Sequence, residues 1–331
     1  MKKLTASFIF RACFCFIAAQ VACTGAALAA ASAGFYVDPQ SSAAVWVDQN
    51  RNDVRAESIK KNIANVPAAK WFGAWVGDIG PAVNAYVTAV NSQDKKPILV
   101  AYNIPNRDCG QYSAGGADSS TAYKTWISAF AAAIRDREAI VIFEPDALPH
   151  FDCLKPQEQI TRLELIKYAV LQFKSKAPKA WVYLDIGNSG WLASSEAGKR
   201  LITAGINEVR GFSLNVSNFR TDEESRIYGN SINSYLEKNL GSHKPFVVDS
   251  SRNGKGSLGN VWCDPVGRKI GIPTRVNPAG LQPEMSLWIK SPGSADGCAA
   301  SAGSFVPDIA FKMMDNFRVL SKKLILNEIS N

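Results

Sequence analysis

Four aspartates follow four apolar segments of the chain: Asp108, Asp146, Asp185 and Asp249. Carboxylates that converge from several strand ends can work as a general acid and a general base, or they can hold a hard cation such as magnesium. Only two histidines occur, which excludes a three-histidine metal site and leaves little material for a Ser-His or Cys-His nucleophile. Acid and base chemistry therefore falls to carboxylates.

Any single aspartate at a strand end could instead cap the following helix. Recurrence at four ends favours a shared site over capping alone. Aromatic side chains accompany the carboxylates, and they are Trp71, Trp75, Tyr102, Trp191 and Trp262. Metal and phosphate chemistry does not need such flat apolar faces, whereas sugar rings stack on them through axial C–H groups. We therefore expect a sugar site without a metal, with about half of the eight tryptophans packed in the core.

The elements that would position these residues alternate along the chain. Apolar runs predict strands at 70–75, 97–103, 139–146, 181–187, 211–218, 245–251 and 286–290. Amphipathic segments between them predict helices at 81–91, 119–137, 156–175, 195–204 and 222–240. Alternating strands and helices imply a parallel sheet with helical crossovers. We predict an α/β fold with a closed parallel barrel related to the TIM barrel, whose strand ends share one catalytic face.

The barrel should use residues 30–331 as a single catalytic domain, because no linker or repeat divides them. The segment 253–282, rich in Gly and Pro, is a long excursion between the last two strands and is expected to be a functional loop. No part of the chain remains for a carbohydrate-binding module.

Residues 1–29 have the pattern of a secretory signal peptide. Lys2, Lys3 and Arg11 precede an uncharged apolar run that ends near Ala27-Leu28-Ala29, so we place cleavage between residues 29 and 33. The run is too short for a membrane anchor. We therefore expect a secreted protein, extracellular or periplasmic on its way out, with no membrane association after cleavage.

Cleavage would leave four of the seven cysteines, at positions 109, 153, 263 and 298. An even number in an exported protein indicates disulfides. Four cysteines allow three connectivities, and sequence order favours Cys109 with Cys153 and Cys263 with Cys298. The close C-x-x-C pairs of a zinc site are absent from the sequence.

The 331 residues are 47% hydrophobic and 20% charged, an ordinary globular mixture. The net charge of +8 is mild, and Lys and Arg are scattered among acidic residues, so we expect no nucleic-acid partner. The segment 252–257 (RNGKGS) superficially resembles a phosphate-binding loop, but it lacks the upstream glycine.

Six motifs in order along the chain resemble glycoside hydrolase family 6, the inverting cellulases. They are YNIPNRDC (102–109), IFEPDAL (142–148), YLDIGNSGWL (183–192), LNVSNF (214–219), VDSSRNG (248–254) with WCD (262–264), and LWIKSPGSADGC (287–298). The resemblance covers nearly all of the chain after the leader. It implies a distorted seven-stranded barrel that hydrolyses β-1,4-glucosidic bonds.

The resemblance also implies roles for three carboxylates. Asp146 in the EPD motif is similar to the family's general acid, and Asp108 to the aspartate that keeps this acid protonated. Asp296 matches the candidate general base, which can act through a water chain. An inverting enzyme needs its two carboxyl groups roughly 6.5 to 9.5 Å apart, with room for a water between them.

The remaining motif residues imply a substrate site and support the two disulfides. The substrate-binding positions are Trp71, Tyr102, Asp185, Asn188, Trp191, Asn215, Trp262 and Lys290. The substrate would be cellulose or a soluble β-glucan, no metal or organic cofactor enters the reaction, and we expect a monomer.

Three departures from the family pattern bear on the activity. Asn188 stands where many members have His, and Ser294 where many have Glu. Ser194 stands where tunnel-forming, exo-acting members have a further Trp, and the 290–298 stretch is short, as in open-cleft members. We therefore predict an endoglucanase. The alternatives are an exo-acting cellobiohydrolase and a catalytically impaired β-glucan-binding protein.

Overall fold

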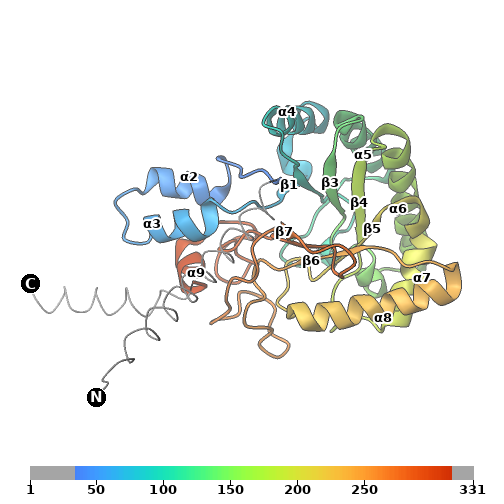
Figure 1. Cartoon of the computed structure of the whole chain (residues 1–331). Coiled ribbons are helices and arrows are strands. Elements are labelled where there is room, and N and C mark those ends of the chain that lie inside the picture. Colours follow the sequence, from blue (N-terminus) through green and yellow to red (C-terminus); the bar gives the residue numbers. More distant parts are fainter. Residues whose placement is uncertain (1–33, 315–331) are drawn as a thin grey trace, which may run out of the picture.

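The computed structural model describes residues 34–314, and its centre is one eight-stranded sheet (Figure 1). The strands are β1 (Lys70–Phe72), β2 (Ile98–Ala101), β3 (Ala139–Phe143), β4 (Ala180–Asp185), β5 (Gly211–Leu214), β6 (Phe246–Asp249), β7 (Arg275–Val276) and β8 (Met285–Leu287). Their order in the sheet is β1-β2-β3-β4-β5-β6-β8-β7. Strands β1 to β6 and β8 pair in parallel, and the short β7 pairs antiparallel with β8.

The predicted α/β barrel with seven parallel strands is confirmed, and β7 is an addition that the sequence did not indicate. Each of the seven predicted strands begins close to its predicted first residue and ends before its predicted last residue. The polar residues that follow each strand form turns and loops instead of extending the strand. Strands β1 and β8 stand where the barrel would close. These two strands do not pair with each other. Next to them, however, the N–H of Ala69, just before β1, donates to the carbonyl of Trp288, just after β8 (2.8 Å). This hydrogen bond connects the two edges of the sheet.

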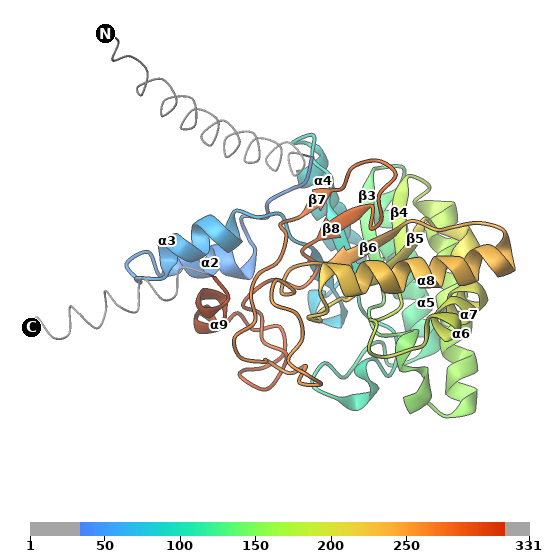
Figure 2. The same ribbon diagram turned by 60° about the horizontal axis from the view of Figure 1, so that its bottom comes forward.

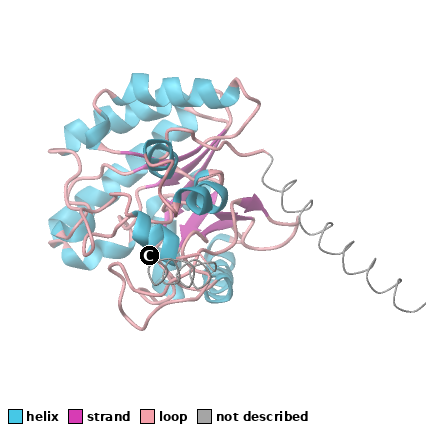
Figure 3. Ribbon diagram, turned by 90° about the vertical axis from the view of Figure 1, so that its left-hand side faces the viewer, coloured by secondary structure: helices cyan, strands magenta, loops and turns pink. Residues whose placement is uncertain are grey.

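Five long helices cover the outside of the sheet (Figures 1 and 3). They are α4 (Ile79–Asn91), α5 (Ser120–Ile134), α6 (Pro156–Lys176), α7 (Ser194–Ala204) and α8 (Asp222–Leu240), close to the predicted ranges. Side-chain caps explain where three of them begin: Asp78 caps α4, Ser119 caps α5, and Thr221 forms a capping box with Glu224 at the start of α8.

Alternating side chains of the strands divide between two hydrophobic cores. Leu99 and Val141 point to the core shared with the outer helices, whereas Val100 and Ile142 point into the barrel. This period of two follows from strand geometry. The fully buried interior fixes the register, because a slip of one residue would exchange the two faces.

A third core lies beside the barrel, where segments from both ends of the described chain meet. Helices α2 (Ser42–Gln49), α3 (Ala56–Ile59) and α9 (Pro307–Lys312) lie together in Figures 1 and 2, with the π-helical turn η1 (Lys60–Ala64) continuing α3. They pack around the fully buried Trp288. The sequence did not predict these short helices, because segments of four to eight residues carry little periodicity.

The predicted signal peptide lies outside the described residues. Within residues 34–314, no helix combines the length and apolar character that crossing a membrane requires.

Candidate active site

The polar residues that follow the parallel strands meet at one edge of the sheet, as predicted. Several of them have left-handed backbone conformations, among them Glu144 (φ 47°), Asp146 (φ 70°) and Asn215 (φ 65°). Non-glycine residues rarely adopt positive φ, and such strain concentrates at functional sites.

Asp146 is held by its neighbour on the next strand. Its backbone N–H donates to Asp185 Oδ2 (2.9 Å). Burial within the rim, followed by the negative charges of Asp185 and Asp108, raises the pKa of Asp146 well above its ordinary value, and Lys290 opposes this effect. A raised pKa favours the protonated form of the carboxyl group, which is the form that a general acid requires.

Asp185 is fully buried at the end of β4. Besides the Asp146 N–H, it accepts hydrogen bonds from the Gly187 N–H (3.2 Å) and the Ser213 hydroxyl (3.1 Å). Burial nevertheless raises the pKa of Asp185 to about 7. Its contacts place it beneath the Asp146 turn, where its charge acts on the acid.

Asp108 lies on the loop after β2, and a disulfide connects this loop to the segment after Asp146. Asp108 Oδ2 accepts the Ser113 N–H (2.7 Å), and its charge contributes to the raised pKa of Asp146. The predicted Cys109–Cys153 bridge is present, with the two Cα atoms 6.0 Å apart. The bridge keeps the loops that bear the two aspartates together.

Asp296 lies on the loop after β8 and is almost fully buried. Both of its carboxylate oxygens are 3.0 Å from Arg252 Nη1, and Oδ1 is 3.4 Å from Lys290 Nζ. The Arg252 guanidinium also donates to the Ser217 carbonyl and lies over the Phe219 ring, 4.3 Å from its centroid. Two cations thus compensate the Asp296 carboxylate.

Asp264 supports Asp296 from the long loop after β6. It accepts the Asp296 N–H (2.7 Å) and the N–H groups of Cys298 and Ala299, while its own N–H donates to Asp296 Oδ2 (3.1 Å). The predicted Cys263–Cys298 bridge joins the same two loops. Asp264 and Arg252 lie in the WCD and VDSSRNG motifs, but the sequence alone did not indicate a role for either residue.

Asp249, at the end of β6, organises the same rim through four backbone donors. They are the N–H groups of Ser217, Ser251, Ile289 and Lys290, at 3.0 to 3.2 Å. This buried carboxylate therefore fixes the backbone from which the Lys290 side chain extends toward Asp296.

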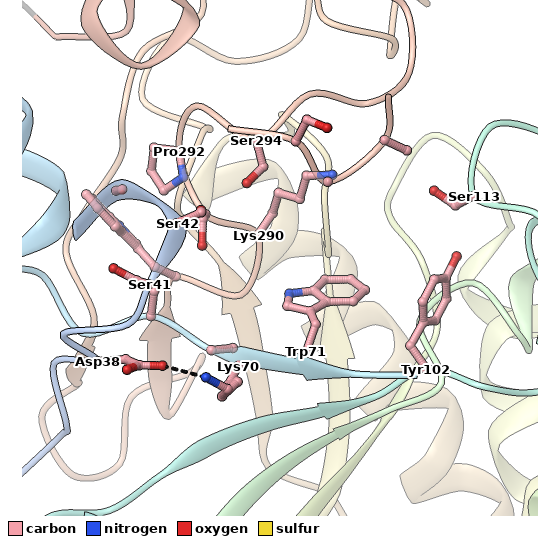
Figure 4. Close-up of a pocket in the computed structure, with 18 of the residues that line it drawn as sticks. Asp38, Ser41, Ser42, Lys70, Trp71, Tyr102, Ser113, Lys290, Pro292 and Ser294 are labelled. Atoms are coloured by element: carbon pink, nitrogen blue, oxygen red, sulfur yellow. Dashed lines mark hydrogen bonds and ion pairs between the residues drawn. The ribbon is translucent and has the colours of Figure 1, made fainter. Parts of the chain in front are cut away.

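A groove of about 570 Å³ is lined in part by Lys290, through which it meets this cluster. Figure 4 shows the groove. Its lining includes Trp71, Tyr102, Lys290 and Ser294. The Trp71 indole N–H donates to the Ile289 carbonyl (2.8 Å), and its ring meets Tyr102 edge to face, with centroids 5.3 Å apart. The charges of Asp146 and Asp108 contribute to a raised pKa of Tyr102, after burial as the main cause, so this ring connects the groove to the carboxylates.

Two other predicted aromatics remain open to solvent. Trp191 is 38% exposed and stacks beside His150, and Trp262 is 42% exposed beside Tyr112, with ring centroids 4.8 and 6.0 Å apart. Exposed indoles beside an acid cluster offer apolar faces for sugar rings.

The two predicted asparagines are buried and bind backbone. Asn215 donates to the carbonyls of Asp249 (2.8 Å) and Arg220 (3.1 Å) and accepts the Arg220 N–H. Asn188 accepts the Gly190 N–H (2.9 Å). Both amides thus hold the loops of the rim, and neither lines the groove. Across residues 34–314, no three His, Cys, Asp or Glu side chains gather as metal ligands.

An aspartate with a raised pKa among other acidic side chains, a second carboxylate and exposed indoles at the carboxyl edge of a parallel barrel are features of a glycoside hydrolase site. The model of the glycosyl hydrolases family 6 matches residues 30–309. The chain belongs to this family.

Relatives agree with this assignment. The chain is 50% identical over 287 residues to Endoglucanase 1 of Streptomyces halstedii, covering 85% of this chain and 88% of that protein. It is 43% identical over 312 residues to Endoglucanase A of Thermobispora bispora, covering 91% and 68%. The endoglucanase Cel6 of Mycobacterium tuberculosis, solved with a thio-linked cellobioside ligand, superposes with a TM-score of 0.79 at 37% identity, covering 85% and 96%.

Proposed function

We propose that the protein is an exported, endo-acting hydrolase of internal β-1,4-glucosidic bonds in cellulose and related β-glucans. The observation that carries the proposal is the setting of Asp146: its backbone is bound to Asp185, its pKa rises well above its ordinary value, and its charge acts on Tyr102 in the wall of the aromatic groove. Membership of the family and similarity to two named endoglucanases support the reaction and the substrate class.

In the proposed reaction, Asp146 gives its proton to the glycosidic oxygen as the bond from this oxygen to the anomeric carbon breaks. A water molecule attacks the anomeric carbon from the opposite face and forms the new C–O bond, which inverts the configuration. The proton lost by this water passes to Asp296, directly or along a chain of waters. Burial, and after it the charges of Asp185 and Asp108, raise the pKa of Asp146 and so favour the return of its proton between turnovers.

Lys290 connects the two halves of this mechanism. Its ammonium is 3.4 Å from Asp296, and its charge also acts on Asp146. Burial lowers the pKa of Lys290, and Arg252 adds to this effect. Lys290 also lines the groove, where it can donate to a sugar hydroxyl.

Endo action is favoured over exo action by the openness of the site. Trp191 and Trp262 are both more than one third exposed, so the described chain does not enclose them as a tunnel would. The three relatives named above, from Streptomyces halstedii, Thermobispora bispora and Mycobacterium tuberculosis, are all named as endoglucanases. An impaired glucan-binding protein would not need Asp146, Asp108 and Asp296 together.

Two disulfides support export, because such bonds persist in oxidising compartments. The predicted signal peptide would direct the protein to the extracellular space or the periplasm. The monomeric state remains a prediction.

Product analysis by NMR on cellulose and on mixed-linkage β-glucan tests this proposal. We expect newly formed α-anomers at the reducing ends, which is the outcome of inversion at a β-linkage. β-Anomeric products would exclude the inverting mechanism. On carboxymethyl cellulose, viscosity should fall before many reducing ends appear. Release of mainly cellobiose without early loss of viscosity would indicate exo action.

A further inference from the structure

Trp75 lines the same groove as Trp71 but takes no part in the mechanism above. It lies in the 3-10 turn η2 (Ala74–Val76) that follows β1, four positions after Trp71. Its side chain is 57% exposed, more than Trp191 or Trp262. A large indole left this open on the wall of a groove is an available contact surface.

The ring of Trp75 is fixed against the backbone. A Cβ atom at Gly73 would come within 2.3 Å of the indole, so the ring lies directly on this glycine. The Arg107 guanidinium lies over it, 5.2 Å from the Trp75 centroid and 4.7 Å from that of Tyr102. Arg107 thus joins Trp75 to Tyr102, a second aromatic ring in the wall of the groove.

Arg107 itself has little freedom to bind an anion. Its Nε donates to the Ser113 carbonyl (2.8 Å), Nη1 to the Tyr102 carbonyl (2.9 Å), and Nη2 to the Ala114 carbonyl (3.4 Å). Backbone oxygens therefore engage all three guanidinium nitrogens. The surface offered to a ligand is a flat apolar ring beside groove hydroxyls such as Ser113, which suits a neutral polyhydroxyl ring.

We propose that Trp75 is a sugar-binding platform, on which a glucosyl unit stacks beyond the unit that Trp71 contacts in the same β-glucan chain. The inference rests on the proposed function and extends it, because it adds one more glucosyl-binding position to the groove. The ring is already immobilised by Gly73 and Arg107, so stacking costs little conformational entropy.

The test is a series of cello-oligosaccharides from cellotriose to cellohexaose, with both kcat/KM and calorimetric affinity measured. Trp75→Ala should lower the values for the longest oligosaccharide by about five- to tenfold, the scale of one aromatic contact, and leave the shortest within about twofold. Gly73→Ala should have the same length-dependent effect, because its methyl group displaces the intact indole. Leu171→Ala is the control, since this apolar side chain is 54% exposed on the outer helix α6.

Equal losses at every length would overturn the proposal, since Trp75 would then only support the Asp108 loop through Arg107. Unchanged values for both variants would overturn it as well. If the wild-type protein cleaves none of these sugars, the proposed function fails. The binding measurements still decide the role of Trp75 in that case, by the presence or absence of a length-dependent loss of affinity.

Discussion

The backbone N–H of Asp146 donates to Asp185 Oδ2 at 2.9 Å, which couples the turn after β3 to the last residue of β4. The bond fixes the strained turn that presents the Asp146 carboxyl group, and it brings a second acidic group underneath. This contact therefore helps to position the proposed acid, and it brings in the Asp185 charge, which adds to the effect of burial in raising the pKa of Asp146.

Asp146→Asn should abolish turnover and preserve the fold. Asparagine is nearly isosteric and the N–H to Asp185 remains, but no proton can be given to the leaving oxygen. We expect kcat on carboxymethyl cellulose to fall by at least about 100-fold, with cello-oligosaccharide affinity little changed. Asp136→Asn, whose side chain is 78% exposed on the surface, is the matched control. Near-normal turnover would remove Asp146 from the mechanism.

Asp108→Asn should shift the pH dependence of kcat/KM. A general acid is active while protonated, so activity is lost as the pH rises through the pKa of Asp146. Removing the Asp108 charge removes one cause of that raised pKa, so the basic limb should move to lower pH. The exposed Asp118→Asn serves as the control. A basic limb that stays in place, or moves to higher pH, would contradict the role of Asp108.

Arg252→Met should destabilise the protein and impair catalysis together. It leaves the buried Asp296 carboxylate with Lys290 as its remaining ion-pair partner within 4 Å in the described structure. Breaking a buried pair costs about 3 to 5 kcal/mol, measurable by urea unfolding. Arg252→Lys should recover part of the stability. Arg226→Met, which breaks an exposed pair with Glu223, should change little. Equal stability of the two Met variants would show that the Arg252 pair is unimportant.

The paired change Cys263→Ser with Cys298→Ser should lower both Tm and activity. The bridge closes a loop across a sequence separation of 35 and joins the segments that bear Asp264 and Asp296. Chain entropy predicts a loss of roughly 3 to 4 kcal/mol. We further expect a reduced kcat well below Tm, because the hydrogen bonds between the two aspartates lose their support. A lower Tm with unchanged kcat would separate the bridge from the site.

The sequence by itself determined the alternation of strands and helices, because each apolar run buries both faces and stops where polar residues begin. It also placed Asp108 and Asp146 after predicted strands, and the order of the four cysteines favoured the two observed pairs. The strands and helices are local features, so they leave a pattern along the chain. The cysteine pairs span longer separations, but four cysteines allow only three connectivities.

Only the tertiary structure decided which groups surround Asp296 and which amides turn inward. Arg252 and Asp264 reach Asp296 across sequence separations of 44 and 32, from loops without regular hydrogen-bonded structure. Asn215 lies in a left-handed turn, and its amide binds backbone in place of pointing into the groove. No periodic pattern records such contacts, because long-range hydrogen bonds and the disulfide, rather than strand or helix geometry, fix the paths of these loops.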